Sequence, residues 1–172
     1  MNYRQLTSLY GYCIDLRELE LTGVFKHIQK EIPRDFTDNL RNLALSPVAQ
    51  SLEVLNLPNN YFGDHTLDAL IQSVLPKLAR LQYIDLSANK LSDQGLQQFF
   101  NAFVKKSKTL KGFKINYNKI KDTLTAQSIQ EALNECHSLE EMSFKKCGIT
   151  LDLFKTMLAM QNGYNGQGFV KY

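Results

Sequence analysis

The chain lacks the features that mark membrane-spanning and secreted proteins. Its 172 residues include no tryptophan and four prolines, and no apolar run approaches the roughly 20 residues of a membrane helix. The opening stretch MNYRQLTSLYGYC has no long apolar region, so no signal peptide is predicted, and no Asn-X-Ser/Thr glycosylation site occurs. We therefore expect a cytoplasmic protein without a membrane partner, or one that works in a host cytosol if it is a secreted effector.

Patterns for catalysis and metal binding are also scarce. Cys13, Cys136 and Cys147 are odd in number and lack the spacing of zinc ligands or a disulfide framework, so we expect thiols in a reducing compartment. The three histidines are not accompanied by a recognisable nucleophile and orienting acid. The stretch NGYNGQG at 162–168 lacks the Gly-Lys-Ser/Thr ending of a phosphate loop and indicates a flexible tail. The sequence predicts no enzyme, no cofactor and no metal.

What the sequence does contain is a repeat. An apolar residue is followed by apolar residues three and five positions later, and by a polar position eight residues later. Copies begin at Leu52, Leu81, Leu110 and Leu139, a constant spacing of 29 residues, and a weaker copy begins at Leu16. A fixed period of this length indicates stacked structural units.

Each unit is expected to form a strand, a turn and a helix. After the strand, apolar residues recur at helical spacing, as in Leu96, Phe99 and Phe100. An aspartate recurs where each helix should begin, and its side-chain oxygen is expected to cap that helix. These aspartates are Asp64, Asp93 and Asp122.

The units are expected to belong to one domain over residues 1–172. We predict a helical cap over 1–15, a last helix near 151–161 and a glycine-rich tail over 162–172. The stretch 24–48 interrupts the repeat. Pro33 should end a helix there, because the residue before proline is pushed away from helical angles.

The residue eight positions after the first leucine is asparagine in three units and Cys147 in the last. Where the chain bends away from a short strand, buried backbone groups still need hydrogen-bond partners. An amide side chain supplies both donors and an acceptor, so it is expected to connect one repeat to the next as a ladder. Cysteine should do so only weakly. The ladder residues are Asn60, Asn89 and Asn118.

The motif LxxLxLxxN, followed by a helix at a period of 28 to 29 residues, resembles the leucine-rich repeat, and specifically its long, ribonuclease-inhibitor-like class. The resemblance covers about residues 16–160. It implies an α/β solenoid, a right-handed arc with parallel β-strands on the concave face and helices on the convex face. It also implies an intracellular protein–protein interaction module. A regulator of a GTPase or of a cytoskeletal protein, or a host-directed effector of an intracellular microbe, is the alternative.

The register of the repeat assigns a candidate binding face. Side chains alternate along a strand, so if the first leucine points inward, two positions per strand face outward. Tyr83 and Val54 should lie side by side at its centre, where exposed anchors favour protein binding. A solvated polar surface is the alternative interpretation. The predicted partner-binding residues are Glu18, Glu20, Val54, Asn56, Tyr83, Asp85, Lys114, Asn116, Ser143 and Lys145.

Charge is unevenly distributed along the chain. Residues 1–90 carry 9 basic and 10 acidic side chains, and residues 91–172 carry 11 and 7. Seven lysines and no acid lie between 105 and 121, which predicts either a solubilising surface or one that attracts an acidic protein, with Lys111, Lys114 and Lys119 along one edge. Nucleic acid is not expected, because the net charge is only +3 and the second half has no arginine. We expect a monomer that binds an unidentified protein.

Overall fold

Six short strands lie in chain order in one parallel sheet in the computed structural model, which describes residues 3–24, 34–121, 123–150 and 170–171. Every neighbouring pair is parallel. From β2 to β5 the paired positions are those that the 29-residue spacing aligns, whereas the partners in β1 and β2 are 36 residues apart and those in β5 and β6 are 28 apart. The strands are β1 (Glu18–Glu20), β2 (Val54–Asn56), β3 (Tyr83–Asp85), β4 (Gly112–Lys114), β5 (Glu141–Ser143) and β6 (Val170–Lys171).

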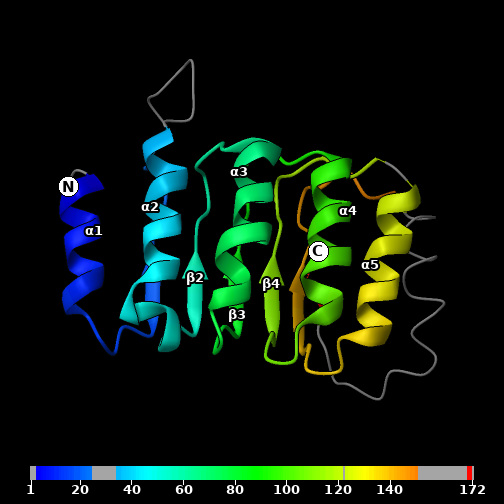
Figure 1. Cartoon of the computed structure of the whole chain (residues 1–172). Coiled ribbons are helices and arrows are strands. Elements are labelled where there is room, and N and C mark those ends of the chain that lie inside the picture. The colour runs from blue at the N-terminus through cyan, green and yellow to red at the C-terminus, as the bar shows by residue number, and fades with distance from the viewer. Residues whose placement is uncertain (1–2, 25–33, 122, 151–169, 172) are drawn as a thin grey trace.

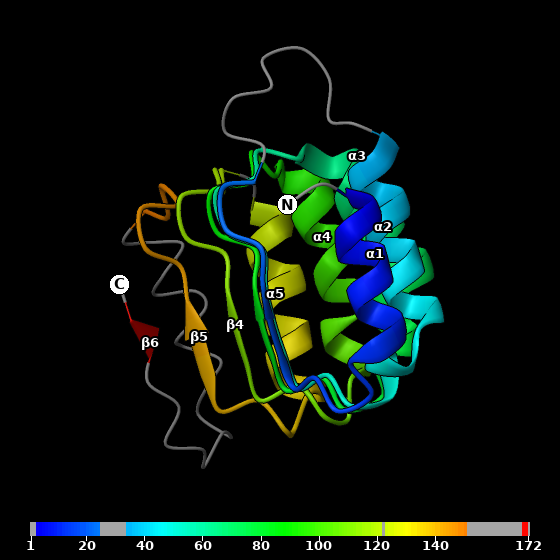
Figure 2. The same ribbon diagram turned by 90° about the vertical axis from the view of Figure 1, so that its left-hand side faces the viewer.

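The helices form a second layer that covers one face of this sheet (Figures 1 and 2). The α/β class and the parallel sheet predicted from the repeat are confirmed. None of the described helices combines the length and the apolar character that a membrane crossing requires. The helices are α1 (Tyr3–Tyr12), α2 (Arg34–Leu45), α3 (Gly63–Ala69), α4 (Asp93–Ala102) and α5 (Thr123–Glu135), with short helical turns η1 (Pro47–Gln50), η2 (Leu70–Val74), η3 (Leu75–Lys77) and η4 (Val104–Lys106).

The sequence predicted a helix near each end of the chain and a glycine-rich tail. Helix α1 lies within the stretch predicted as a helical cap, and α2 begins directly after Pro33. The helix expected near 151–161 and the tail up to residue 169 lie outside the described residues. Val170–Lys171 pairs with β5 as a sixth strand, although no strand was predicted there.

The core lies between the sheet and the helices. The middle residue of each of the first five strands points into it, and each is at most 8% exposed: Leu19, Leu55, Ile84, Phe113 and Met142. The ring of Phe113 contacts Phe100 and Phe144 edge to face, at centroid distances of 5.3 and 5.6 Å. Burial of each such side chain contributes about 1.5–3 kcal/mol. The residues on either side of the middle position therefore face away from the helices.

The three asparagines at the ends of the strands are buried and link adjacent repeats. The Asn89 side chain accepts a hydrogen bond from the Asn60 N–H (2.9 Å) and donates one to the Leu57 carbonyl (2.8 Å). Asn118 accepts from the N–H groups of Asn89 (3.1 Å) and Leu91 (3.0 Å). Each amide thus supplies hydrogen-bond partners to backbone groups in the bend, where the chain no longer pairs with a neighbouring strand.

The residue before each ladder asparagine adopts a left-handed backbone conformation, and so does the residue before Cys147 at the matching position of the last repeat. Asn59, Ala88, Tyr117 and Lys146 have φ between 54 and 61°. Such a conformation costs a non-glycine residue about 1–3 kcal/mol, so it persists only where the surrounding structure enforces it. The hydrogen bonds of the neighbouring asparagines offset this cost, so the bend recurs with the same shape in each repeat.

Cys147 takes the place of asparagine in the last described repeat. Its Sγ donates to the Ile115 carbonyl at 3.1 Å, as the Asn118 side chain donates to the Leu86 carbonyl at 3.0 Å. Burial raises the pKa of the Cys147 thiol to about 11, although the nearby backbone of Asn118 and Tyr117 acts in the opposite direction. The thiol therefore stays protonated at neutral pH and remains a donor.

Asp64 and Asp93 are not the N-caps of α3 and α4, contrary to the sequence prediction. The N-cap of α4 is Ser92, whose side chain accepts from the Gly95 N–H, and the N-cap of α3 is Phe62, which makes no side-chain cap bond. Asp64 instead reaches the next repeat, where its carboxylate accepts from the Ser92 N–H (2.9 Å) and the Ser92 hydroxyl. The side chain of Asp122 lies outside the described residues.

Asp93 repeats this arrangement one unit later. It accepts from the Lys121 N–H at 3.0 Å and from the Thr125 hydroxyl at 2.8 Å. A second polar ladder therefore connects the helix starts. The close approach of Asp64 to α4 also explains a glycine, because a Cβ at Gly95 would collide with the Asp64 carboxylate.

We predict that Asn89→Ala lowers the free energy of unfolding by about 1–3 kcal/mol, because the buried Asn60 N–H loses its partner. Asn118→Ala should cost at least as much, since two N–H groups lose theirs. Urea denaturation measures both changes. Asn134→Ala, at an exposed position of α5, is the control and should change stability by less than about 0.5 kcal/mol. Equal effects at all three positions would contradict a structural role for the ladder.

Gly95→Ala tests the aspartate ladder. Alanine is favoured over glycine inside a helix by about 1 kcal/mol, yet we predict a net loss of about 1–2 kcal/mol, because Asp64 must give up Ser92. In an Asp64→Ala background the same substitution should become stabilising. Gly11→Ala in α1, where no atom lies within 4 Å of the added Cβ, should be stabilising in both backgrounds. An unchanged sign at position 95 would show that Asp64 does not restrict it.

Candidate functional site

The face of the sheet that points away from the helices is the candidate site, and we refer to it as the sheet face. The strand register places two rows of outward side chains on it. One row runs through Glu18, Val54, Tyr83, Gly112 and Glu141, and the other runs through Glu20, Asn56, Asp85, Lys114 and Ser143.

A shallow hollow of about 170 Å³ lies at the centre of the sheet face. It brings together five of the predicted binding residues with Gly112 and Glu141 on the neighbouring strands. Acidic, amide, aromatic and lysine side chains therefore meet within one small concavity. The five predicted residues are Val54, Asn56, Tyr83, Asp85 and Lys114.

The ring of Tyr83 owes its position to a glycine on the next strand. Tyr83 pairs in register with Gly112, and an added Cβ at Gly112 would lie only 2.8 Å from the tyrosine Cδ1. The ring therefore rests against the backbone of β4 and stays half-buried. The sequence places Gly112 on this face, but the spacing of a single chain does not reveal that this glycine supports the neighbouring ring.

The first end of the sheet face is acidic. The Glu18 carboxylate accepts from the side-chain amide of Asn56 at 3.3 Å, which connects β1 to β2. The Glu20 carboxylate accepts from the Thr22 hydroxyl at 2.7 Å. Both carboxylates are exposed, so they remain accessible to a bound partner.

The opposite end of the sheet face differs from the prediction at one residue. Ser143, predicted to face a partner, is only 3% exposed, and its hydroxyl donates to the side-chain carbonyl of Asn116 at 2.8 Å. The same Asn116 oxygen accepts from the Lys145 N–H at 2.6 Å. The Asn116 side chain thus holds β5 and the loop that follows it, and Ser143 donates one of the two hydrogen bonds. The exposed side chain at this end is that of Lys145.

The seven lysines between 105 and 121 do not form a single surface. Lys105 bonds Glu131 (3.1 Å) and Glu135 (3.0 Å) of α5, and these bonds raise the pKa of Lys105. Lys111 precedes β4 and Lys119 follows it, so the expected edge of Lys111, Lys114 and Lys119 is wrong. Only Lys114 of these three belongs to the sheet face.

Two lysine–tyrosine pairs were not foreseen from the sequence. The Lys90 ammonium lies over the Tyr61 ring at 5.0 Å from its centroid, and Lys146 lies over Tyr117 at 5.3 Å. Each pair joins residues 29 positions apart, so the repeat spacing itself could have identified them. In the described ranges, no group of three His, Cys, Asp or Glu side chains is arranged to hold a metal ion.

Comparison with known proteins shows the fold and does not show a family. No protein-family profile matches the chain. Over 122 residues it is 27% identical to the Tonsoku-like protein of Danio rerio, a match that covers 69% of this chain and 8% of that protein. The chain therefore spans only a small part of the length of this curated relative.

Two solved structures share the architecture along most of the chain. The tropomodulin C-terminal domain of Caenorhabditis elegans has a TM-score of 0.69 at 13% identity, covering 93% of this chain and 91% of that domain. Actin-binding site 2 of leiomodin-1 has a TM-score of 0.70 at 17% identity, covering 93% and 87%. At such identities the similarity establishes a leucine-rich-repeat-like fold and no activity.

Proposed function

We propose that this chain is a non-enzymatic protein–protein interaction module that binds its partner through the sheet face. The observation that carries the proposal is the hollow around Tyr83, whose ring is supported by Gly112 and surrounded by polar and charged side chains. Aromatic anchors at the centre of a polar surface are where binding energy concentrates in protein interfaces. A ring that is already in place loses little entropy when it is bound.

The size of the hollow favours a protein over a small molecule. Sites for small ligands and cofactors typically enclose about 300–1,000 Å³. The hollow on the sheet face measures about 170 Å³, which suits one or two side chains projecting from a partner. The exposed carboxylates of Glu18 and Glu20 at one end and the ammonium groups of Lys114 and Lys145 at the other would fix the direction in which the partner lies.

We further propose that the sheet face is the concave side of a right-handed arc of the ribonuclease-inhibitor-like class. Figure 2 supports this, because β4 and β5 lie progressively farther toward the side away from the helices. We propose a single domain that works as a monomer in the cytosol. The free thiols of Cys13, Cys136 and Cys147 suit such a reducing compartment.

A cytoskeletal partner is the second candidate, and actin is the first protein to test. The observation that favours it is the structural similarity to actin-binding site 2 of leiomodin-1 over 93% of this chain. The alternative regulatory target, a GTPase, has no comparable observation.

The general proposal predicts a loss of partner binding after Tyr83→Ala and Lys114→Glu are combined. The double variant, immobilised and exposed to a cytosolic extract, should capture at least about fivefold less of any protein that wild type captures, which corresponds to about 1 kcal/mol. The matched control combines Tyr12→Ala with Lys77→Glu, at exposed positions of α1 and η3. Equal capture by wild type and the sheet-face variant would move the interface to another surface.

The actin candidate is tested separately with purified actin. Wild type should bind actin in calorimetry, Tyr83→Ala should weaken the complex by about fivefold or more, and Tyr12→Ala should leave it unchanged. Absence of binding would reject actin and leave the sheet-face proposal to the capture experiment. Binding that Tyr83→Ala does not affect would place actin on another face.

A further inference from the structure

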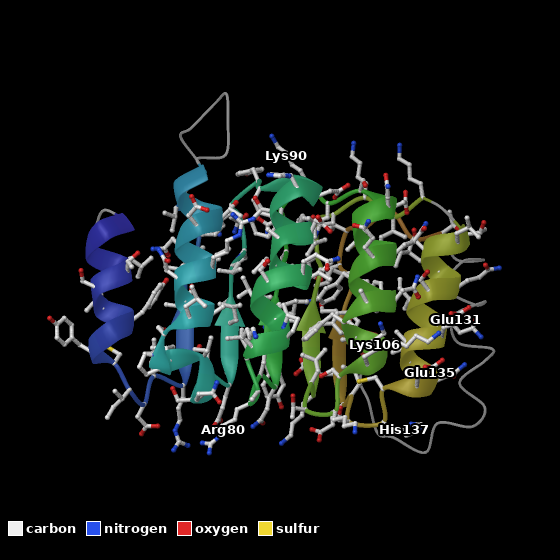
Figure 3. All side chains as sticks on the ribbon, in the orientation of Figure 1. Arg80, Lys90, Lys106, Glu131, Glu135 and His137 are labelled. Atoms are coloured by element: carbon white, nitrogen blue, oxygen red, sulfur yellow. The ribbon has the colours of Figure 1, made fainter. Side chains whose placement is uncertain are left out.

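The loops that follow β3, β4 and β5 carry lysines and no acid, and the loop that follows β2 carries no charge. We name this surface the strand-end edge; it comprises residues 57–63, 86–92, 115–121 and 144–150. Figure 3 shows Lys90 at this edge, with Lys106 and His137 toward the opposite edge. Its lysines are all exposed, and in the described chain none of them lies within 4.0 Å of a carboxylate: Lys90, Lys119, Lys121, Lys145 and Lys146.

The lysines surround an open hollow of about 550 Å³. Lys90, Lys119 and Lys121 line it together with Tyr117, and among the described residues of its lining Asp93 is the one carboxylate. That carboxylate already accepts from the Lys121 N–H and from the Thr125 hydroxyl, so it is committed to the aspartate ladder. The described lining therefore holds three ammonium groups against one carboxylate, and a bound anion would offset the excess positive charge.

The repeat gathers lysines on this one edge. Lys90 and Lys119 occupy the same position of consecutive repeats, and Lys121 lies two residues after Lys119. Charges of one sign on one surface repel one another and oppose the compact state. A partner of opposite sign removes this repulsion when it binds.

The two lysine–tyrosine pairs decide between the classes of anion. Stacking of nucleic-acid bases requires exposed aromatic faces. On the strand-end edge, one face of Tyr61 and one face of Tyr117 are covered by Lys90 and Lys146, 5.0 and 5.3 Å from the ring centroids. The edge contains no arginine, the residue suited to bidentate phosphate recognition. The absence of arginine and the partly covered rings therefore favour the carboxylates of a polypeptide over a nucleic acid.

We propose that the strand-end edge binds an acidic, extended polypeptide segment that crosses the loops of successive repeats. Four strands span about 14 Å, which an extended chain covers with about four to five residues at about 3.3 Å each. A stretch of about five residues rich in Glu or Asp thus reaches every lysine of the edge. This surface borders the sheet face and has Lys145 in common with it, but Lys90, Lys119 and Lys121 lie outside the sheet face, so binding here does not depend on it.

The test uses two fluorescent probes of equal net charge, a short peptide of Glu, Gly and Ser and a single-stranded oligo-dT. Anisotropy is measured at about 0.05 M and about 0.3 M salt with the whole chain. The edge variant is Lys90→Gln, Lys119→Gln, Lys121→Gln. The matched control is Lys77→Gln, Lys106→Gln, Lys108→Gln, which removes the same charge from exposed positions of η3, of η4 and of the loop that follows η4. A third variant replaces the three edge lysines with arginine and keeps the charge.

We expect the acidic peptide to bind wild type, the control and the arginine variant alike, and to bind the edge variant about tenfold more weakly, with affinity falling as salt rises. An equal loss in the control variant would overturn the site, because net charge alone would then account for binding. Tighter binding of oligo-dT than of the peptide, with the same dependence on the edge, would overturn the polypeptide assignment in favour of nucleic acid. Failure of the peptide to bind wild type at low salt would overturn the proposal outright.

Discussion

The hydrogen bonds from buried asparagine amides to the backbone of adjacent repeats are the interaction on which the rest of this structure depends. Each of the first five strands is only three residues long, so the sheet alone leaves the following bend without partners. Asn60, Asn89 and Asn118 supply those partners at distances of 2.6 to 3.1 Å. They hold a left-handed residue before each asparagine, a conformation that non-glycine residues otherwise avoid. The aspartates at 64 and 93 add a second set of connections at the helix starts.

Both candidate binding surfaces follow from this register. On the sheet face, Tyr83 rests against Gly112 because the two residues are aligned in adjacent strands. At the strand-end edge, Lys90 lies over Tyr61 because the two residues occupy matching positions in the aligned bends of consecutive repeats. The register hydrogen bonds position the residues of both surfaces in the absence of a partner, and a site that is already ordered loses less entropy on binding. Both proposed binding sites therefore follow from how the repeats are aligned.

The 29-residue spacing predicted the strands and the row of positions 54, 83 and 112, because a constant period determines which residues become neighbours in a stack. It did not predict contacts that depend on which neighbour a side chain reaches. Asp64 looked like the cap of its own helix, but its carboxylate reaches Ser92 of the next repeat. Ser143 follows the outward alternation, yet Asn116 of the preceding repeat engages its hydroxyl and it is buried. Both cases require the distance between repeats, which sequence periodicity does not contain.

Native-state hydrogen exchange without any partner tests most directly whether the asparagine ladder holds the repeats in register. The amides of Asn60 and Asn89 donate to ladder side chains, and those of Leu57 and Leu86 donate to backbone carbonyls of the adjacent repeat. The account predicts that all four exchange only through global unfolding, with the same free energy of opening. If Asn60 and Asn89 exchanged through local opening while Leu57 and Leu86 stayed protected, the bends would be mobile and the ladder would not be what fixes the two surfaces.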